Sequence, residues 1–211
     1  DQDVLKNIKR SNISIDAYRQ FLNFMNGLDK DAQTYTEIIL GLPGDTKEKH
    51  FDSLRYGIES QVNSVRMYQA MLLSGTDMAS KETREKFGLL TKFRIVPGGV
   101  GIYQFANEKV RVAEIEEIVV GGKGMPFEDY ISCRIMNLLI ETYLNNALCE
   151  EIFAAMRAMG LSVFDFLAFM HQHNELYTPR FKEIIDAFVE ATSEDLYGSR
   201  EQAESSVLDP A

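Results

Sequence analysis

The first part of the chain alternates between helical and strand-like patterns. Residues 37–40 form a short apolar run bounded by turn residues, as in a buried parallel strand, and residues 64–73 predict a second strand. Apolar residues at three- and four-residue spacing predict helices before, between and after these strands, over 3–10, 14–28, 51–62 and 77–87. Helical segments between strands imply parallel pairing through right-handed crossovers. Because two parallel strands cannot cover their own edges, we expect this region to be the end of a larger barrel or sheet.

The first strand runs directly into the turn sequence GLPGDT at residues 41–46. Pro43 presets φ for the second position of a turn, and Gly44 permits the positive φ that a type II turn needs at its third position. Asp45 is expected to cap the next helix, with Glu48 reaching back as in a capping box. Ligands of α/β folds bind at the loop that follows a strand, so this turn is the first candidate functional segment. The alternative is an ordinary strand-to-helix corner.

The second half of the chain follows a different pattern. An irregular connector with one or two short strands is expected first, and glycines and one proline interrupt its apolar stretches. A helical domain of four helices is expected next, starting with a long helix at about Phe127. The third helix is expected to start after a Ser162 cap, and the fourth begins at Thr178-Pro179. The remaining residues are polar and predict a partly mobile tail. The expected units are therefore residues 1–97, 98–125, 126–192 and 193–211.

Composition and charge exclude several classes of partner. The 211-residue chain has 26% charged residues and a formal net charge of −10. Nonspecific binding to nucleic acid or to anionic lipid needs a basic face, so neither is expected. No apolar run approaches the length that spans a bilayer, and the first residues lack a signal-peptide pattern. A cytoplasmic location is expected, and the start at Asp1 inside a helical pattern favours a piece of a longer protein.

Few residues carry obvious chemistry by themselves. Cys133 and Cys149 cannot make a disulfide framework or a four-cysteine metal site, and we interpret both as free thiols packed as small hydrophobic groups. His171 and His173 point to different sides of a helix, so they are not expected to share a metal ion. The glycines of residues 98–101 resemble a phosphate-binding loop only superficially. Neither a catalytic-triad signature nor a dinucleotide-binding motif is present.

Three stretches taken together resemble a known family. VLKNIKR at 4–10, EIILGLPGDT at 37–46, and VRMYQAMLLSGTDM at 65–78 followed by REKFG at 84–88 resemble the second half of a radical S-adenosylmethionine (SAM) catalytic domain. The closest group is the one whose members often carry an N-terminal cobalamin-binding domain. The resemblance covers about residues 4–97. It implies an α/β fold, namely the C-terminal part of a partial (βα)6 barrel, here followed by a mainly α-helical domain.

The resemblance also implies where the adenine of SAM would lie. In the family, the fifth barrel strand supplies an apolar and backbone seat for this ring. Ile39 and Gly41 match the isoleucine and glycine of that strand, whereas Glu37 and Gly44 depart from the more usual glycine and glutamate. The match therefore covers only part of the motif.

Further SAM contacts follow from the same resemblance. Arg10 falls where some members place an arginine on the SAM carboxylate, a role that suits a guanidinium fork. Leu42 is expected beside the adenine, and the backbone of Ala70, Met71 and Leu72 is expected to flank the ring. These residues complete the candidate SAM-binding set, and no catalytic residue or metal ligand is assigned.

The family's chemistry needs a CxxxCxxC loop that holds a 4Fe–4S cluster, which this chain lacks together with the first four barrel strands. The chain alone is therefore expected to be inactive and to bind no cofactor. It would be part of an oxidoreductase or methyltransferase that uses SAM and a 4Fe–4S cluster, with or without cobalamin. Its partners would be the missing N-terminal barrel, an unknown small-molecule or peptide substrate, and a second copy through an exposed strand edge. The alternative is a stand-alone binding or assembly module built on helices 127–191.

Overall fold

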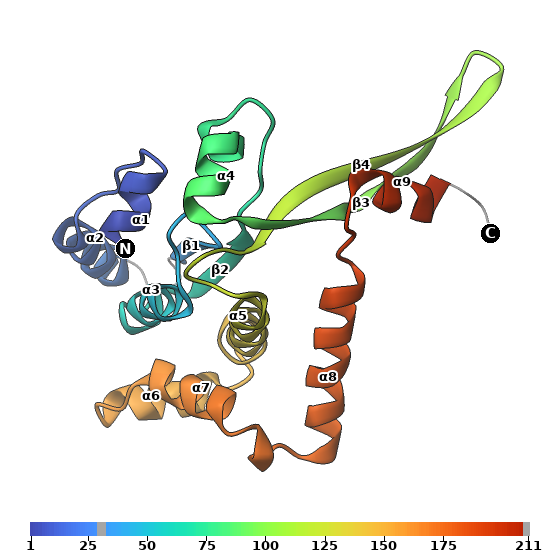
Figure 1. The fold of residues 1–211 in the computed structure, drawn as a ribbon. Helices are drawn as coiled ribbons and strands as arrows, with labels where there is room; N and C mark the ends of the chain where they lie inside the picture. The colour runs from blue at the N-terminus through green and yellow to red at the C-terminus, as the bar shows by residue number, and fades with distance from the viewer. Residues whose placement is uncertain (29–32, 209–211) are drawn as a thin grey trace.

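The computed structural model describes residues 1–28 and 33–208 and contains a small parallel sheet, a long hairpin and a helical region (Figure 1). The N-terminal part consists of α1 (Gln2–Asn7), α2 (Ile15–Leu28), β1 (Tyr35–Leu40), α3 (Lys47–Glu59) and β2 (Ser64–Gln69). The predicted order of helices and strands is found here. Ser14 caps α2 as its position suggests, because its Oγ accepts the N–H of Ala17 at 3.1 Å.

Strands β1 and β2 pair in parallel, from Tyr35 opposite Ser64 to Leu40 opposite Gln69. The expected strand over 64–73 is shorter than predicted, because the chain leaves β1 after Gln69. Residues 70–72 pair instead with the long hairpin: the N–H of Leu72 donates to the carbonyl of Glu117 at 2.8 Å. The small parallel sheet is thereby tied to the hairpin along one side.

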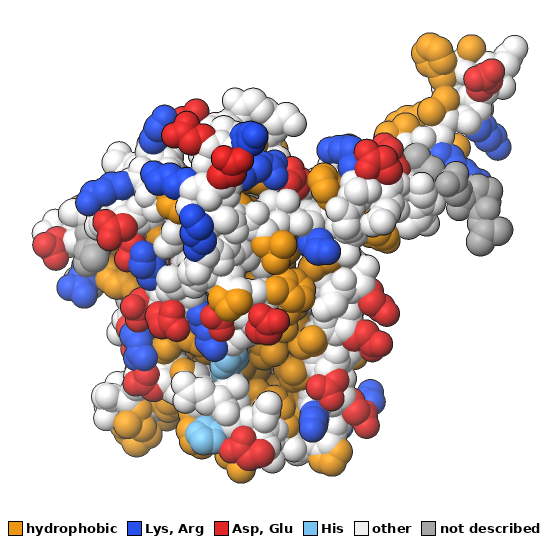
Figure 2. Space-filling view, in the orientation of Figure 1, with side chains coloured by type: hydrophobic (Ala, Val, Ile, Leu, Met, Phe, Trp, Pro, Cys, Tyr) orange, Lys and Arg blue, Asp and Glu red, His pale blue; other side chains and the backbone are white. Residues whose placement is uncertain are grey.

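Residues 98–125 do not form the irregular connector that we predicted. Strands β3 (Leu90–Phe105) and β4 (Glu108–Gly121) form one long antiparallel hairpin, preceded by the 3₁₀ turn η1 (Asp77–Ala79) and by α4 (Lys81–Phe87). The register shifts between Ile95 and Val100, and this irregularity accommodates Pro97 and the glycines that suggested a break. The hairpin tip extends away from the rest of the molecule, and hydrophobic side chains gather on it (Figure 2).

The helical region has the predicted number of main helices with the predicted caps. It contains α5 (Phe127–Ile140), the π-helical turn η2 (Glu141–Asn145), α6 (Glu150–Ala158), α7 (Val163–Gln172), the 3₁₀ turn η3 (Asn174–Leu176) and α8 (Pro179–Glu194). The Oγ of Ser162 accepts from the N–H of Asp165 at 2.9 Å, and the Oγ1 of Thr178 accepts from the N–H of Phe181 at 3.3 Å. Among the described residues no single helix is long and apolar enough to cross a membrane.

The described part of the C-terminal tail, up to residue 208, is more regular than its polar sequence predicted, and residues 209–211 of the predicted tail lie outside the described residues. Residues 200–208 form helix α9 (Arg200–Leu208), which packs on β3 and β4. Ala203 of this helix is fully buried, and a guanidinium nitrogen of Arg200 donates to the carbonyl of Ile115 at 3.0 Å. Before the helix, Tyr197 and Phe93 exchange two backbone hydrogen bonds. The segment therefore adds a bridge to the hairpin, where we had expected a mobile end.

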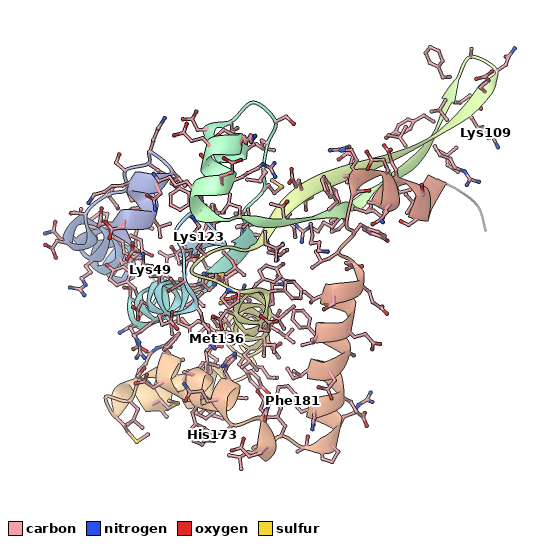
Figure 3. The ribbon with its side chains drawn as sticks, viewed as in Figure 1. Lys49, Lys109, Lys123, Met136, His173 and Phe181 are labelled. Carbon is pink, nitrogen blue, oxygen red and sulfur yellow. The ribbon has the colours of Figure 1, made fainter. Side chains whose placement is uncertain are left out.

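The main hydrophobic core covers one face of the parallel sheet. It joins α3, β2, α5 and α7, with Leu54, Val65, Met136 and Leu167 at its centre (Figure 3). Residues on the opposite face of the same sheet are open, and Tyr68 retains 48% of its surface. A barrel strand normally buries both faces. In this sheet the core covers one face, and the other face is open to solvent.

Candidate functional site

The turn after β1 has the predicted geometry, with one correction to its cap. The N–H of Asp45 donates to the carbonyl of Leu42 at 2.9 Å, and Gly44 has φ of +84°, as a type II turn requires. The residue that caps α3 is Thr46, one position later than we predicted, because its Oγ1 accepts from the N–H of Lys49 at 3.2 Å. The turn and the helix start are therefore fixed by local chemistry.

Asp45, which we had predicted as the cap, instead forms a hydrogen bond with the residue that follows β1. Its Oδ2 accepts the N–H of Gly41 at 3.3 Å, and its Oδ1 accepts the N–H of Thr46 at 3.0 Å. Only 8% of its surface is exposed. Burial raises the pKa of Asp45 to about 6, although the two backbone donors act against this rise. A carboxyl group that titrates near neutral pH thus lies inside the candidate loop.

Gly41 allows the strand end to approach β4 closely. Its φ is +86°, a conformation that favours glycine, and a Cβ added here would lie 3.1 Å from the carbonyl oxygen of Val119. The backbone of the turn consequently packs directly against the hairpin. The glycine match to the family motif therefore has a structural reason in this chain, whatever binds beside it.

A cleft of about 520 Å³ lies along β1 and is called the β1-edge cleft here. It touches four successive residues of β1, Thr36 to Ile39. Since successive side chains of a strand point to opposite faces, a cleft that meets all four must lie at the strand's edge. Among the described residues β1 pairs with β2 alone, so this is its unpaired edge.

Three of the predicted SAM contacts meet in the β1-edge cleft. Arg10 reaches it from the segment between α1 and α2, Ile39 from the end of β1, and Leu42 from the turn. Lys49 of α3, labelled in Figure 3, lines it too and holds the turn by donating from Nζ to the carbonyl of Gly44 at 3.2 Å. The cleft thus combines two cationic residues and an apolar wall with four acidic residues, Asp1, Glu37, Asp45 and Asp52.

The other predicted contacts lie beside the cleft and do not line it. Ala70 and Leu72 are buried with Val119 in a small apolar cluster, against which Ile39 and Leu42 pack. Met71, between them, retains 41% of its surface. Gly41 is buried and does not line the cleft. The segment 70–72 therefore supports the residues that line the cleft from the side of the hairpin.

His50 is a cleft residue that our sequence reasoning missed. It is 1% exposed, its Nε2 lies 3.5 Å from the Oδ1 of Asn137, and its Nδ1 has no partner among the described residues. Burial lowers the pKa of His50 to about 4, so the imidazole is neutral at physiological pH. Its position four and eight residues before Leu54 and Ile58 continues the inward stripe of α3, and this spacing could have identified it.

The open face of the sheet carries polar and aromatic groups. Arg66 of β2 lies opposite Glu37 of β1, and its guanidinium stacks 4.5 Å from the ring centroid of Tyr35. Tyr68 stands opposite Ile39 on the same face. Such a mixture of charge and aromatic surface suits contact with a ligand or a polar partner better than burial in an apolar core.

The residues present do not fit a 4Fe–4S cluster. Cys133 is buried, and burial raises the pKa of its thiol to about 12, so it is not the thiolate that iron needs. No group of three or more His, Cys, Asp or Glu side chains suited to a metal ion occurs among residues 1–28 and 33–208. His171 contacts Ser132 and His173 contacts Glu175, so the two histidines have separate surroundings.

The β1-edge cleft does fit part of a SAM molecule. Its size lies within the usual range of small-molecule sites. Ile39 and Leu42 offer apolar surface for a ring, and the guanidinium of Arg10 offers a fork for a carboxylate. When bound, SAM would supply a methyl or adenosyl group; the residues of this chain would bind and orient it.

Comparison with known proteins supports the resemblance to radical SAM enzymes. The chain is 34% identical over 92 residues to the cobalamin-dependent radical SAM methyltransferase TokK of Streptomyces tokunonensis. It is 30% identical over 129 residues to the tRNA-2-methylthio-N(6)-dimethylallyladenosine synthase of Symbiobacterium thermophilum. These alignments cover 43% and 58% of the chain but only 13% and 27% of the two relatives. No protein-family model matches the chain.

Proposed function

We propose that this chain is the C-terminal part of the catalytic domain of a radical SAM enzyme. In this proposal β1 and β2 are the last two strands of a partial (βα)6 barrel, and the helices from Phe127 onward form an accessory domain. The parent enzyme would use SAM and a 4Fe–4S cluster held by residues outside this chain. Both partial relatives agree with this assignment.

The observation that carries the proposal is the unpaired edge of β1 beside a formed cleft. An exposed edge presents a row of free backbone groups, and folded proteins rarely leave one uncovered. The next barrel strand would pair with β1 here and would place its own residues beside Arg10. A self-contained module, in contrast, would have both edges of its sheet covered.

The roles of the residues follow from their chemistry. Arg10 would bind the SAM carboxylate, Ile39 and Leu42 would contact the adenine, and Gly41 would let the backbone approach closely. Ala70, Met71 and Leu72 would support this wall from the hairpin side. The open face with Arg66 and Tyr68 would turn toward the barrel interior, where the substrate would lie.

Binding of SAM tests the proposal directly. The complete product of the gene, with everything encoded in frame before Asp1, would be purified without oxygen and titrated with SAM by calorimetry. Arg10→Ala should weaken binding about tenfold or more, because a charge-assisted fork is lost. Lys9→Ala is the matched control, since Lys9 is exposed and pairs with Asp77 at the surface. Undiminished SAM affinity in Arg10→Ala, or no binding to the unmodified protein, would reject the proposal.

Several properties of the parent remain part of the same proposal. Cobalamin use is suggested by one relative, whose name includes it. A small molecule or a peptide is the proposed substrate, with methyl transfer or oxidoreduction as the reaction. We also propose a cytoplasmic location and, where the β1 edge is not covered by the rest of the barrel, dimerisation through it.

An assembly role for the helical region is the second candidate. Large apolar side chains are exposed on α6 and α7, including Ile152 at 55% and Phe169 at 50%. Such a surface is typical of a contact with another protein or domain. The mass of the chain in solution, measured by light scattering, discriminates the candidates: a dimer broken by Phe169→Glu favours the assembly role, whereas a dimer broken by Ile39→Glu favours the open strand edge.

A further inference from the structure

A second cavity, of about 150 Å³, lies where α5, α8 and the base of the hairpin meet. In Figure 1, α8 rises beside α5 and its C-terminal end reaches the hairpin. Arg94 of β3, Tyr130 and Arg134 of α5, and Thr192 of α8 line this cavity. It lies apart from the β1-edge cleft and shares no lining residue with it.

Arg134 makes no ion pair with any of the described residues. Its Nε is closed off from solvent and has no hydrogen-bond partner among the described residues. Its guanidinium lies 5.4 Å from the ring centroid of Phe188, a contact that stabilises the charge but supplies no acceptor for the Nε–H. A buried donor without an acceptor is costly, so an acceptor is expected nearby.

The neighbouring groups add positive charge and donors. Arg94 lines the same cavity, although Glu116 and Gln69 engage part of its guanidinium. The Tyr130 hydroxyl lies within the field of both arginines, and burial of this tyrosine raises its pKa, so it stays a neutral donor. Thr192 contributes a second hydroxyl.

Two features of α8 offset part of the positive charge that Arg94 and Arg134 place in the cavity. The carbonyl end of a helix carries a partial negative charge, and α8 ends at this cavity. Asp195 also lines the cavity, but it is exposed to solvent and makes no ion pair with Arg134. Neither feature supplies an acceptor for the closed Nε–H of Arg134.

We propose that this cavity binds a small oxyanion, a carboxylate or a phosphate group, through the guanidinium of Arg134. The planar fork of arginine matches two oxygens of either anion, and the Tyr130 and Thr192 hydroxyls complete the donor set. A volume of about 150 Å³ holds an anion of a few heavy atoms and excludes a nucleotide. The site is independent of the proposed SAM site.

Thermal unfolding in different sodium salts tests this site. Phosphate, sulfate and acetate would be compared with chloride at equal ionic strength and pH, with the melting temperature as readout. We expect at least one oxyanion to raise the melting temperature of the unmodified complete gene product saturably. The effective anion identifies the source, since acetate alone indicates a carboxylate and phosphate with sulfate indicates a tetrahedral anion.

Variants separate binding at Arg134 from general salt effects. Arg134→Gln should weaken the apparent anion affinity about tenfold or more, and Arg134→Lys should weaken it less. Arg180→Gln at the far end of α8 removes the same charge from an exposed pair and should respond as the unmodified gene product does. If Arg134→Gln unfolds, Thr192→Val, which keeps the volume and loses one donor, should still reduce the anion response. Equal anion responses in all variants, or none in the unmodified gene product, would overturn the proposal.

Discussion

The carboxylate of Asp45 accepts the backbone N–H of Gly41 at 3.3 Å and thereby ties the start of the α3 region to the end of β1. This bond closes the turn whose residues line the β1-edge cleft. Because Asp45 is buried, its protonation state affects both the turn and the stability of the fold. The consequences can be measured by substitution.

Asp45→Asn should change how stability depends on pH. The carboxyl group has an ordinary pKa of 3.8 and a folded-state pKa of about 6, so the folded chain retains a proton that the unfolded chain has released. Its ionisation therefore lowers stability as pH rises from about 4 to 6, by roughly 3 kcal/mol for about two pKa units. Relative to the unmodified chain, Asp45→Asn should gain about this amount across the window, as measured by urea unfolding.

The exposed Asp186 supplies the control for this experiment. Asp186→Asn removes a carboxylate from the surface of α8 and should leave the pH dependence unchanged. The structural account of Asp45 fails if the Asp45→Asn difference is the same at pH 4 and pH 6.5.

His50→Gln should reveal a slope of the opposite sign. Burial lowers the pKa of His50 from 6.5 to about 4. Between these two pH values the histidine binds a proton in the unfolded chain but not in the folded chain. The histidine therefore makes stability rise with pH between about 4 and 6.5, by roughly 3 kcal/mol. His50→Gln should lose this rise. His173→Gln, at a more exposed histidine, is the control. A parallel pH profile for His50→Gln and the unmodified chain would contradict the burial argument.

Gly41→Ala should be more destabilising than Gly75→Ala. Both glycines have nearly the same positive φ, +86° and +85°, but only the Cβ at Gly41 would meet the carbonyl of Val119, at 3.1 Å. We expect a loss of about 1 kcal/mol at Gly75 from backbone strain alone, and about 2–3 kcal/mol at Gly41. Chemical denaturation measures both values. Equal losses would mean that the close approach to β4 contributes nothing.

Ile39→Glu should abolish SAM binding by the complete gene product while leaving the fold intact. The side chain is partly exposed at the cleft, so a carboxylate there remains hydrated but removes the apolar seat proposed for the adenine. Ile184→Glu, at an apolar residue that is 48% exposed on α8, is the matched control and should bind SAM normally. Calorimetric titration together with circular dichroism checks both variants. Normal SAM affinity in Ile39→Glu would contradict the proposal that Ile39 contacts the adenine.

The parts of the fold that follow from local chemistry were predictable. The turn at Pro43 and Gly44, the caps at Ser162 and Thr178, and the order of helices and parallel strands depend on residues close in sequence. The hairpin was missed because Pro97 and its neighbouring glycines suggest breaks, whereas pairing with β4 accommodates them in a register shift. Helix α9 is polar, and its packing on the distant strands β3 and β4 could not be predicted from its own sequence.

The candidate site, like the fold, was only partly predictable from the sequence. Arg10, Ile39 and Leu42 line one cleft, whereas the SAM contacts that the family resemblance implied for them stay a prediction. The positions of segment 70–72 behind that cleft and of Arg134 in its own cavity depend on contacts between distant elements. No local pattern encodes such contacts, so the sequence identified segment 70–72 only through the family resemblance and did not identify Arg134.

The most direct test of the central claim is the coding sequence upstream of Asp1, read in frame. The proposal predicts further βα units and a CxxxCxxC motif in the same reading frame, which would supply the strand that covers β1 and the thiolates that this chain lacks. A continuous upstream reading frame without that motif, or a stop codon and start site directly before Asp1, would contradict the proposal that this chain completes a radical SAM barrel.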